Sequence, residues 1–172
     1  MYDILGDIKE GGTFLFNTVW SPEELDEKLP SKVKHQLAQK HVKFYIINAE
    51  DVDKELKLNG KTNAVLQAAF FKLADIIPID EAVGYMKDAI KKTYGRKGQN
   101  IVDMNCAAVD AGITHIHKVE VPESWKNAQS EDLSVKHDGE GKLIDYVNDV
   151  LVPINQFRGM QLPVSTFEAY QT

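Results

Sequence analysis

Apolar residues recur every three or four positions through the middle of the chain, which is the spacing of amphipathic helices. The clearest case is residues 63–77, NAVLQAAFFKLADII, where apolar positions occupy an unusually wide face that includes the adjacent Phe70 and Phe71. A face this wide cannot be covered by a single neighbour. We therefore expect this helix to be packed on more than one side, and the question is what covers it.

Two shorter runs have the composition of β-strands. Residues 11–19, GGTFLFNTV, form an apolar run that predicts a fully buried strand, and residues 42–50, VKFYIINAE, are rich in β-branched and aromatic residues. Two helices are predicted between them, at 21–29 and 31–41, and Pro30 separates the two. Strand, helix and strand in this order predict a crossover unit with parallel strands, for which the right-handed form is strongly preferred.

The helix predicted at 21–29 begins with a recognisable signal. Ser21 is placed as its N-cap, Pro22 falls in the first turn, and Glu24 follows three residues after the serine. This spacing predicts a capping box, in which the serine and glutamate side chains each bind the other residue's backbone N–H.

The chain remains mainly helical as far as residue 116. Further helices are predicted at 49–58, where Asn59-Gly60 ends the helix, at 78–95, where Gly95 is the stop, and at 99–116. A short strand is predicted at 118–122.

The C-terminal part has a different character. Residues 123–141 are polar, contain glycine and lack periodicity, which indicates a linker. An amphipathic helix is predicted at 142–157, and Pro153 should bend or end it. Residues 158–172 are predicted to be extended.

Helices outnumber strands in this prediction, which has consequences for the fold class. Two parallel strands cannot cover such wide helical faces or protect their own edges. The chain also opens on an apparent helical turn, MYDILGDI, where an α/β domain would normally start with a strand. We therefore expect a helix-rich α/β fold with a small parallel sheet, either truncated from a larger domain or completed by oligomerisation.

Composition and charge exclude several classes of protein. The chain has 172 residues, of which 43% are hydrophobic and 27% charged, as in one globular domain with a possible appendage. Its net charge of −6, from 20 basic and 26 acidic residues, argues against nucleic acid and anionic membranes as partners. A single cysteine, no signal-peptide layout and no apolar run near the roughly 20 residues of a membrane span predict a cytoplasmic protein.

Motifs for catalysis are scarce. Neither G-x-G-x-x-G nor G-x-x-x-x-G-K-S/T occurs, so the two common phosphate-binding loops are absent from the sequence. Cys106 lies in an alanine-rich helix, which favours a small buried thiol over a nucleophile. His115 and His117 have no third or fourth ligand at a zinc-like spacing and are best interpreted as surface residues.

One candidate site follows the first predicted strand. Asn17, Thr18 and Trp20 stand at its carboxyl end, where open α/β sheets bind ligands. The alternative is that Asn17 caps the next element and Trp20 packs, and the sequence favours neither alternative.

A second candidate site lies at a junction between helices. Lys91, Lys92, Arg96 and Lys97 could bind a phosphate together with the amino end of the following helix. Cations at the end of a helix also favour its dipole without any ligand, and this is the interpretation that the sequence favours.

Four segments stand out in order along the chain: QAAFFKLADIIP, KKTYGRKG, an MN-x-AAVDA pattern and LPVS. In this order they closely resemble the central portion of the pyruvate:ferredoxin (flavodoxin) oxidoreductase family. The resemblance implies that residues 1–122 are the C-terminal portion of a gamma-type catalytic domain. It implies that residues 123–172 are a linker and helix leading toward the iron–sulfur domain.

The resemblance also implies a chemistry. The family decarboxylates pyruvate oxidatively with thiamine diphosphate, passes electrons through [4Fe–4S] clusters to ferredoxin or flavodoxin, and transfers the acetyl group to coenzyme A. The gamma-type domain is associated with coenzyme A. We therefore expect a coenzyme A docking and domain-contact surface, with other domains or subunits of the oxidoreductase as partners and no cofactor or metal held by this chain alone.

Individual residues match the family pattern. Asn17 and Trp20 match its LN-x-x-W turn, Asn63 opens the N-x-x-x-QAAFF helix, and Asn105 belongs to MN-x-AAVDA. Lys61 stands where the family more often has arginine, and Gly112 stands where it more often has alanine. Coenzyme A is expected first at the turn of Asn17, Thr18 and Trp20, with Lys91, Lys92, Arg96 and Lys97 as second-choice phosphate contacts.

Parts of the family pattern do not occur. The glycine-rich segment and first strands that open the gamma-type domain, the cluster-binding cysteines and the thiamine-binding domains are all missing from the sequence. The chain is therefore expected to be a fragment that is not catalytically competent alone and that forms homo-oligomers when isolated. The alternative is a free-standing gamma-type interaction subunit without catalytic activity of its own. A nucleotide-binding protein of another family is less favoured, because the phosphate loops are absent.

Overall fold

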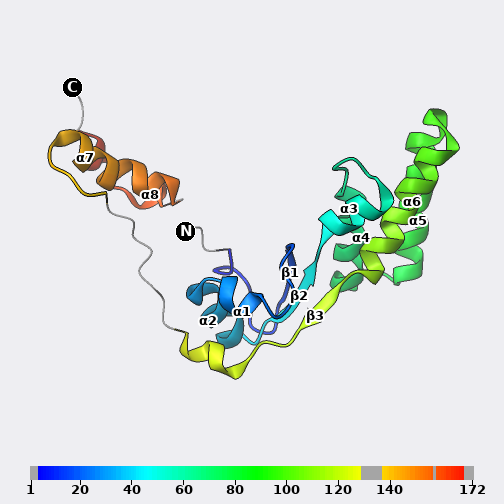
Figure 1. Cartoon of the computed structure of the whole chain (residues 1–172), viewed down its shortest axis with the longest axis horizontal. Coiled ribbons are helices and arrows are strands. Elements are labelled where there is room, and N and C mark those ends of the chain that lie inside the picture. The colour runs from blue at the N-terminus through cyan, green and yellow to red at the C-terminus, as the bar shows by residue number, and fades with distance from the viewer. Residues whose placement is uncertain (1–3, 129–136, 157, 169–172) are drawn as a thin grey trace. The chain divides into compact units, whose positions relative to one another are not determined.

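A computed structural model of the chain describes residues 4–128, 137–156 and 158–168. The chain divides into two compact units (Figure 1). The main unit is Ile8–Gln129, and the small unit combines Met1–Asp7 with Ser130–Thr172. The predicted domain boundary between residues 122 and 123 stays a prediction.

A three-stranded sheet forms the middle of the main unit. Its strands are β1 (Thr13–Asn17), β2 (Lys43–Ile47) and β3 (His117–Val119), in the order β1-β2-β3. β1 and β2 are parallel, with Thr13 opposite Lys43, whereas β3 is antiparallel to β2. The predicted parallel pair is confirmed, and the third strand makes the sheet mixed.

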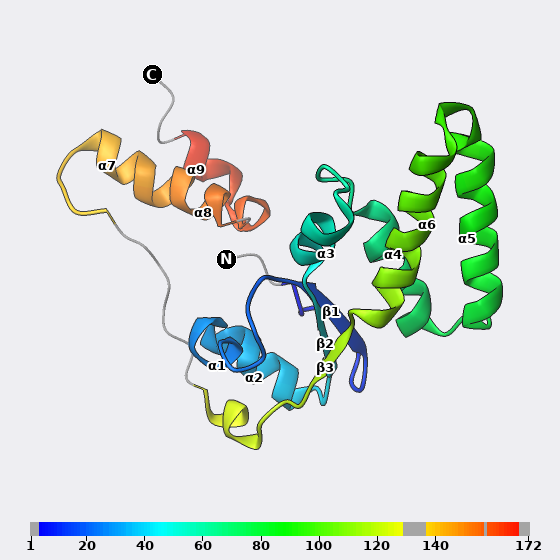
Figure 2. The same cartoon turned by 45° about the vertical axis from the view of Figure 1, so that its right-hand side comes forward.

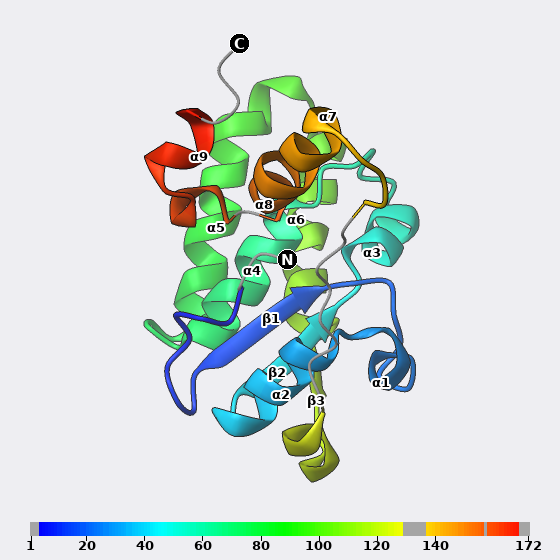
Figure 3. The same ribbon diagram turned by 90° about the vertical axis from the view of Figure 1, so that its left-hand side faces the viewer.

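The strand β1 is less buried than predicted. Its sequence predicts a fully buried strand, but Phe14, Leu15 and Phe16 are only half-buried and both end residues are exposed. The reason is its place at an edge of the sheet, where β2 is its only strand partner among the described residues. Figure 3 shows β1 in front of β2 and β3.

The helices α1 (Leu25–Lys28) and α2 (Ser31–Gln39) connect the parallel strands. The predicted capping box is confirmed: the Ser21 N–H donates to Glu24 Oε2 at 2.9 Å, and the Glu24 N–H donates to Ser21 Oγ at 3.4 Å. Regular α-helix nevertheless starts only at Leu25, after a turn. Pro30 ends this stretch as predicted and stands just before α2.

Four helices lie on the other side of the sheet from α1 and α2, as Figures 1 and 2 both show. They are α3 (Ala49–Leu56), α4 (Asn63–Ala74), α5 (Ile79–Tyr94) and α6 (Gln99–Thr114). All four confirm predicted helices, with shifts at their ends. At the junction of α5 and α6, Gly95 does not stop the chain in a left-handed turn. A 3-10 turn, η1 (Gly95–Lys97), continues to Gly98, and it is Gly98 that takes the positive φ of 110°.

The wide apolar face of α4 is covered on two sides, which confirms the expectation for residues 63–77. Val65 and Ala69 belong to a core cluster with Ile47 of β2 and Ala108 of α6. On its other flank Ala68 belongs to a second cluster with residues of α5 and α6. Phe70 points outside both clusters and remains 55% exposed.

The first part of the predicted linker is a structured element. A 3-10 turn, η2 (Glu123–Asn127), buries Trp125, whose indole Nε1–H donates to Asp26 Oδ1 at 2.6 Å. His35 Nδ1 lies 2.7 Å from the carbonyl oxygen of Lys126. The prediction of a linker was therefore wrong for Glu123–Asn127, because one tryptophan anchors a polar segment. Residues 129–136 lie outside the described residues.

The small unit is helical but irregular. It contains α7 (Lys142–Tyr146), a π-helix η3 (Val147–Leu151), α8 (Val152–Asn155), a 3-10 turn η4 (Gly159–Gln161) and α9 (Val164–Glu168). The π-helix ends at Leu151, two residues before Pro153. This agrees with the predicted disturbance, since proline has no N–H and its ring clashes with the preceding turn. The extended tail predicted for 158–172 was wrong, because Gly159–Gln161 and Val164–Glu168 are helical. Within the described ranges, no helix is both long and apolar enough to cross a membrane.

Candidate binding groove

An open groove of about 840 Å³ lies between α4 and α5 and is also lined by residues of α6. Because α4 and α5 are joined by a short connection, they run in opposite directions and the start of α4 lies beside the end of α5. The residues that line the groove come from both ends of both helices. The groove therefore has two ends with different chemistry.

One end of the groove is polar and cationic. Lys61 precedes α4, Asn63 is its first residue, Lys97 follows α5, and Asn105 comes from α6. Among the described residues, neither Lys61 nor Lys97 forms an ion pair with a carboxylate. The Lys97 ammonium lies 5.4 Å from the centre of the Tyr94 ring, a cation–π distance. This end presents cations that an anionic ligand could neutralise.

Asn105 is the most constrained polar group at this end. Its side chain is half-buried, and its Nδ2–H donates to the carbonyl oxygen of Ile101 at 2.7 Å. That bond fixes the amide plane and uses only one of its donors, and no described hydrogen bond uses its side-chain oxygen. Asn105 is therefore held in place with an acceptor available to a ligand.

The opposite end of the groove is apolar. Phe71 and Ile77 from the end of α4 and its connection face Tyr85 and Met86 from the start of α5. Tyr85 is 66% exposed and Met86 is buried. An aromatic surface that is open to solvent and backed by core residues can accept a flat or aliphatic group.

The predicted site residues divide between the groove and other places. Asn63 and Lys97 both line the groove, although they are far apart in the sequence. Lys91, Lys92 and Arg96 are exposed near the same helix junction but are not among the lining residues, and Lys91 pairs with Asp88 at 3.3 Å. The structure thus brings together one of the four predicted phosphate contacts and the asparagine that opens α4.

The turn after β1 is engaged in internal contacts. Asn17 Oδ1 accepts from the backbone N–H of Ala49 at 3.1 Å, at the start of α3, and Thr18 Oγ1 accepts from the N–H of Trp20 at 3.1 Å. The Trp20 ring packs edge-on against Phe16, with 5.9 Å between centroids, and the Lys28 ammonium lies 5.8 Å from its centre. None of the three predicted residues lines the groove. Their role in ligand binding stays a prediction.

Several groove residues were not predicted as site residues, among them Lys61, Tyr94 and Asn105. The sequence contained a signal for one of them, since Asn105 interrupts an otherwise apolar and alanine-rich helical stretch. Nothing in the sequence pattern alone places Lys61 and Tyr94 together, because they meet only through the packing of α4 against α5.

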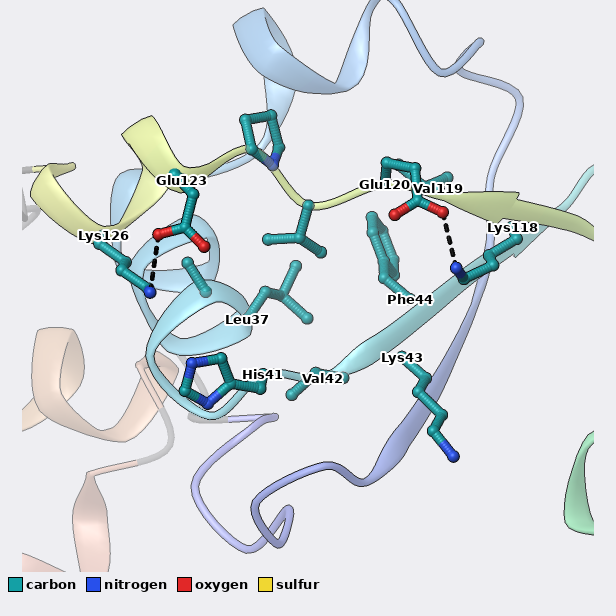
Figure 4. Close-up of a pocket in the computed structure, with 13 residues that line it drawn as sticks. Leu37, His41, Val42, Lys43, Phe44, Lys118, Val119, Glu120, Glu123 and Lys126 are labelled. Carbon is teal, nitrogen blue, oxygen red and sulfur yellow. Dashed lines mark hydrogen bonds and ion pairs between the residues drawn. The ribbon is translucent and has the colours of Figure 1, made fainter.

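A smaller cavity of about 240 Å³ lies between α2, β2, β3 and the segment that leads to η2 (Figure 4). Phe44 contributes to its apolar wall. At its rim Lys118 pairs with Glu120 at 2.6 Å, and Lys126 pairs with Glu123 at 2.7 Å. Hydrogen bonding to Glu120 raises the pKa of Lys118, and hydrogen bonding to Lys126 lowers the pKa of Glu123. Because these cations are already paired, the groove is the better candidate for an anionic ligand.

The described residues contain no group of three or more histidine, cysteine, aspartate or glutamate side chains placed to hold a metal ion. A [4Fe–4S] cluster needs four thiolates, whereas the chain has one cysteine. That residue, Cys106, is half-buried and packs against the cluster between α5 and α6. These residues do not fit an iron–sulfur cluster.

Comparison with known proteins adds to this geometry. The family model described as pyruvate ferredoxin/flavodoxin oxidoreductase matches residues 1–115. The pyruvate-flavodoxin oxidoreductase of Enterobacter agglomerans is 46% identical over 170 residues, which cover 99% of this chain. The pyruvate:ferredoxin oxidoreductase of Moorella thermoacetica is 43% identical over 166 residues, or 96% of this chain. The pyruvate dehydrogenase [NADP(+)] of Cryptosporidium parvum is 37% identical over an aligned length of 190 residues, gaps included, that covers 97% of this chain.

The matched segment is a small part of each of these relatives. It spans 14% of the length of the first two and 10% of the third. Both the polar and the apolar residues of the groove lie within the region that the family model covers.

Proposed function

Since the chain belongs to the pyruvate ferredoxin/flavodoxin oxidoreductase family, we propose that it supplies a coenzyme A docking surface to an enzyme that oxidatively decarboxylates pyruvate. We place this surface in the groove between α4 and α5. The observation that carries the proposal is that Lys61, Asn63, Lys97 and Asn105 line the same groove as apolar side chains such as Phe71 and Met86.

The chemistry of coenzyme A suits a groove of this kind. The ligand combines phosphates, an amide-containing pantetheine arm, an adenine ring and a thiol. Lys61 and Lys97 would neutralise phosphate charge, and the amides of Asn63 and Asn105 would exchange hydrogen bonds with the pantetheine amides. The groove volume of about 840 Å³ lies within the roughly 300–1,000 Å³ of typical small-molecule sites.

The names of the relatives support a role for this segment that does not depend on the electron acceptor. They refer to flavodoxin, ferredoxin and NADP(+), and all contain a segment similar to this chain. The three relatives share this segment although their names give different electron acceptors. The segment is therefore better suited to a step that all three enzymes share, such as acyl transfer to coenzyme A, than to contact with the acceptor. In this proposal, thiamine diphosphate and the [4Fe–4S] clusters are held by other parts of the enzyme. This chain binds and orients the thiol substrate.

The affinity of the isolated chain for coenzyme A is expected to be weak. The cations of the groove are exposed, and the chain carries a net charge of −6, which opposes a polyanion. A dissociation constant near millimolar corresponds to about −4 kcal/mol. The free energy from one lysine–phosphate contact is then a large share of the total.

Calorimetric or fluorescence titration with coenzyme A tests the proposal. Lys97→Gln and Asn105→Ala should each weaken binding by about threefold to tenfold, because each removes a charge-assisted or oriented hydrogen bond. Lys54→Gln, an exposed lysine of α3, removes the same charge away from the groove and should bind as the parent does. Equal binding by the parent and both groove variants would refute the proposed location.

A second proposal is favoured by exposed apolar side chains on α4 and after it. Phe70 is 55% exposed and Ile76 is 71% exposed. These residues suit a domain-contact surface, as expected for a gamma-type interaction subunit without catalytic activity of its own. Co-purification of the chain with the remaining parts of the oxidoreductase, lost in a Phe70→Ser variant, would support it.

A further inference from the structure

A tyrosine at the end of α5 stands beside one of the cations of the groove. Tyr94 is the last residue of α5, and it lines the groove together with Lys97. The Lys97 ammonium lies 5.4 Å from the centre of the Tyr94 ring, within the roughly 6 Å at which an aromatic face attracts a cation. The two side chains therefore form a pair in the wall of the groove.

The local backbone explains why these two residues meet. The 3-10 turn η1 follows Tyr94 and leads through Gly98 into α6, which lies beside α5 (Figure 2). A 3-10 helix places the side chains of residues i and i+3 in line, so the turn brings Lys97 over Tyr94. Arg96 precedes Lys97 in the same turn and is exposed, but it does not line the groove. The turn thus assigns one of two neighbouring cations to the groove.

The core fixes the Tyr94 ring. The ring is half-buried and packs against the cluster that includes Ile90 of α5 and Val102 of α6. A side chain held between two helices keeps little rotamer freedom, whereas the exposed Lys97 has a long and flexible aliphatic stem. The fixed ring therefore restricts the positions that the flexible ammonium group can occupy.

We propose that Tyr94 is a positioning residue that holds the Lys97 ammonium in place for a phosphate of coenzyme A. This inference rests on the proposed docking function of the groove. An ammonium group has several N–H donors, and attraction to the ring does not use all of them, so Lys97 can donate to phosphate oxygens while it stays over the ring. Because the ammonium is already placed, binding costs less conformational entropy of the lysine side chain.

NMR of the ligand-free chain tests the pairing of the two side chains. A lysine over an aromatic face experiences the ring current, so the Hε protons of Lys97 should resonate upfield of those of Lys54, an exposed lysine of α3. Tyr94→Leu should abolish this difference, and Tyr94→Phe, which keeps the ring, should retain it. Lys97 protons of the parent that resonate with those of Lys54 would overturn the proposal without any ligand.

Titration with coenzyme A, followed by NMR, tests the effect on binding. Tyr94→Leu should weaken binding by about threefold, the size expected for loss of an exposed cation–π contact. Tyr94→Phe should bind as the parent does, because the ring that holds Lys97 is kept. Equal binding by the parent and Tyr94→Leu would overturn the positioning role and leave the docking proposal in place.

A double-mutant cycle separates positioning from a purely structural role. If Tyr94 acts through Lys97, Tyr94→Leu should weaken binding no further in a Lys97→Gln background. Arg96→Gln is the matched control, because it removes the neighbouring cation of the same turn. In that background Tyr94→Leu should still weaken binding by about threefold. A loss of the same size in the Lys97→Gln background would overturn the proposal, because Tyr94 would then act on the ligand directly or through the fold.

Failure of the docking proposal has a different signature. In that case the Lys97 protons would show the ring-current shift, but the parent would not bind coenzyme A even well above millimolar concentration. The pairing of Tyr94 with Lys97 would then be real, and its proposed role toward coenzyme A would be overturned together with the docking surface.

Discussion

A β-carbon at Gly112 would lie only 2.2 Å from the backbone carbonyl oxygen of Val65. The helices α4 and α6 therefore cross with no space for a side chain at this glycine. Ala68 lies at the same crossing, with its own Cβ 3.0 Å from the same point. Because the obstructing atoms are backbone, they cannot yield by a change of rotamer. This crossing holds α6, and with it Asn105, against the start of α4.

We predict that Gly112→Ala lowers the free energy of unfolding by about 1–3 kcal/mol, because the two helices must separate. Urea unfolding followed by circular dichroism measures the change. Gly84→Ala is the matched control: Gly84 lies within α5 with no neighbouring atom within 4 Å of the point where a Cβ would stand, and alanine there should stabilise by about 0.5–1 kcal/mol. Equal stability of Gly112→Ala and the parent would show that the crossing is looser than described. Where family members carry alanine at this position, we expect a wider spacing of the two helices.

Trp125 is predicted to be part of the folded main unit. Trp125→Ala should lower its stability by about 3–5 kcal/mol through loss of a buried ring, and Trp125→Phe by about 1 kcal/mol through loss of the hydrogen bond to Asp26. Thermal unfolding of both variants provides the measurement. If both unfolded like the parent, the segment Glu123–Asn127 would be a linker after all.

The capping box should give the chain a small acid sensitivity. Hydrogen bonds from Lys28 and from the Ser21 N–H lower the pKa of Glu24 below its ordinary value. The stabilisation is therefore present above the ordinary glutamate pKa and is lost as pH falls through the lower folded value. Titration of the Glu24 side chain by NMR should show the lowered midpoint. Lys28→Met removes the donor that lowers the pKa of Glu24 most and should move that midpoint upward. A midpoint that does not change in this variant would mean that the hydrogen bond from Lys28 does not form in solution.

The turn after β1 should behave as a structural element. Asn17→Ala removes the hydrogen bond to the Ala49 N–H and should cost about 1 kcal/mol of stability, as loss of a side-chain cap usually does. Asn17→Asp keeps an acceptor and should cost less. Chemical unfolding of the two variants side by side tests this, and equal losses would show that the bond to Ala49 contributes nothing.

Local sequence signals predicted much of the fold. Pro30, the Ser21–Glu24 capping box and the β-branched run at 42–50 correctly located α1, α2 and β2. These signals depend on residues that are close together in the sequence, so they can be identified without knowing the tertiary contacts. The parallel pairing of β1 with β2 followed from the helical crossover between them.

The failures share a physical cause, which is dependence on distant contacts. Trp125 is ordered through Asp26, which is far away in the sequence, so the polar composition of 123–141 could not reveal η2. The half-buried state of β1 depends on which strands pair with it, and its apolar sequence indicates only that it could be buried. The groove was not predicted because it arises from the way α4, α5 and α6 pack together. Asn63 and Asn105 were noticed through the family pattern, but only the packing of α4 on α6 places them at one end.

The most direct test of the proposed docking surface is an NMR titration of the chain with coenzyme A, followed through the backbone amides and the Trp20 indole. We predict shifts at the polar end of the groove, led by Asn63, Lys97 and Asn105, while the Trp20 indole stays unchanged. Shifts centred on Asn17, Thr18 and Trp20, with the groove amides unmoved, would contradict this and place the ligand at the turn after β1.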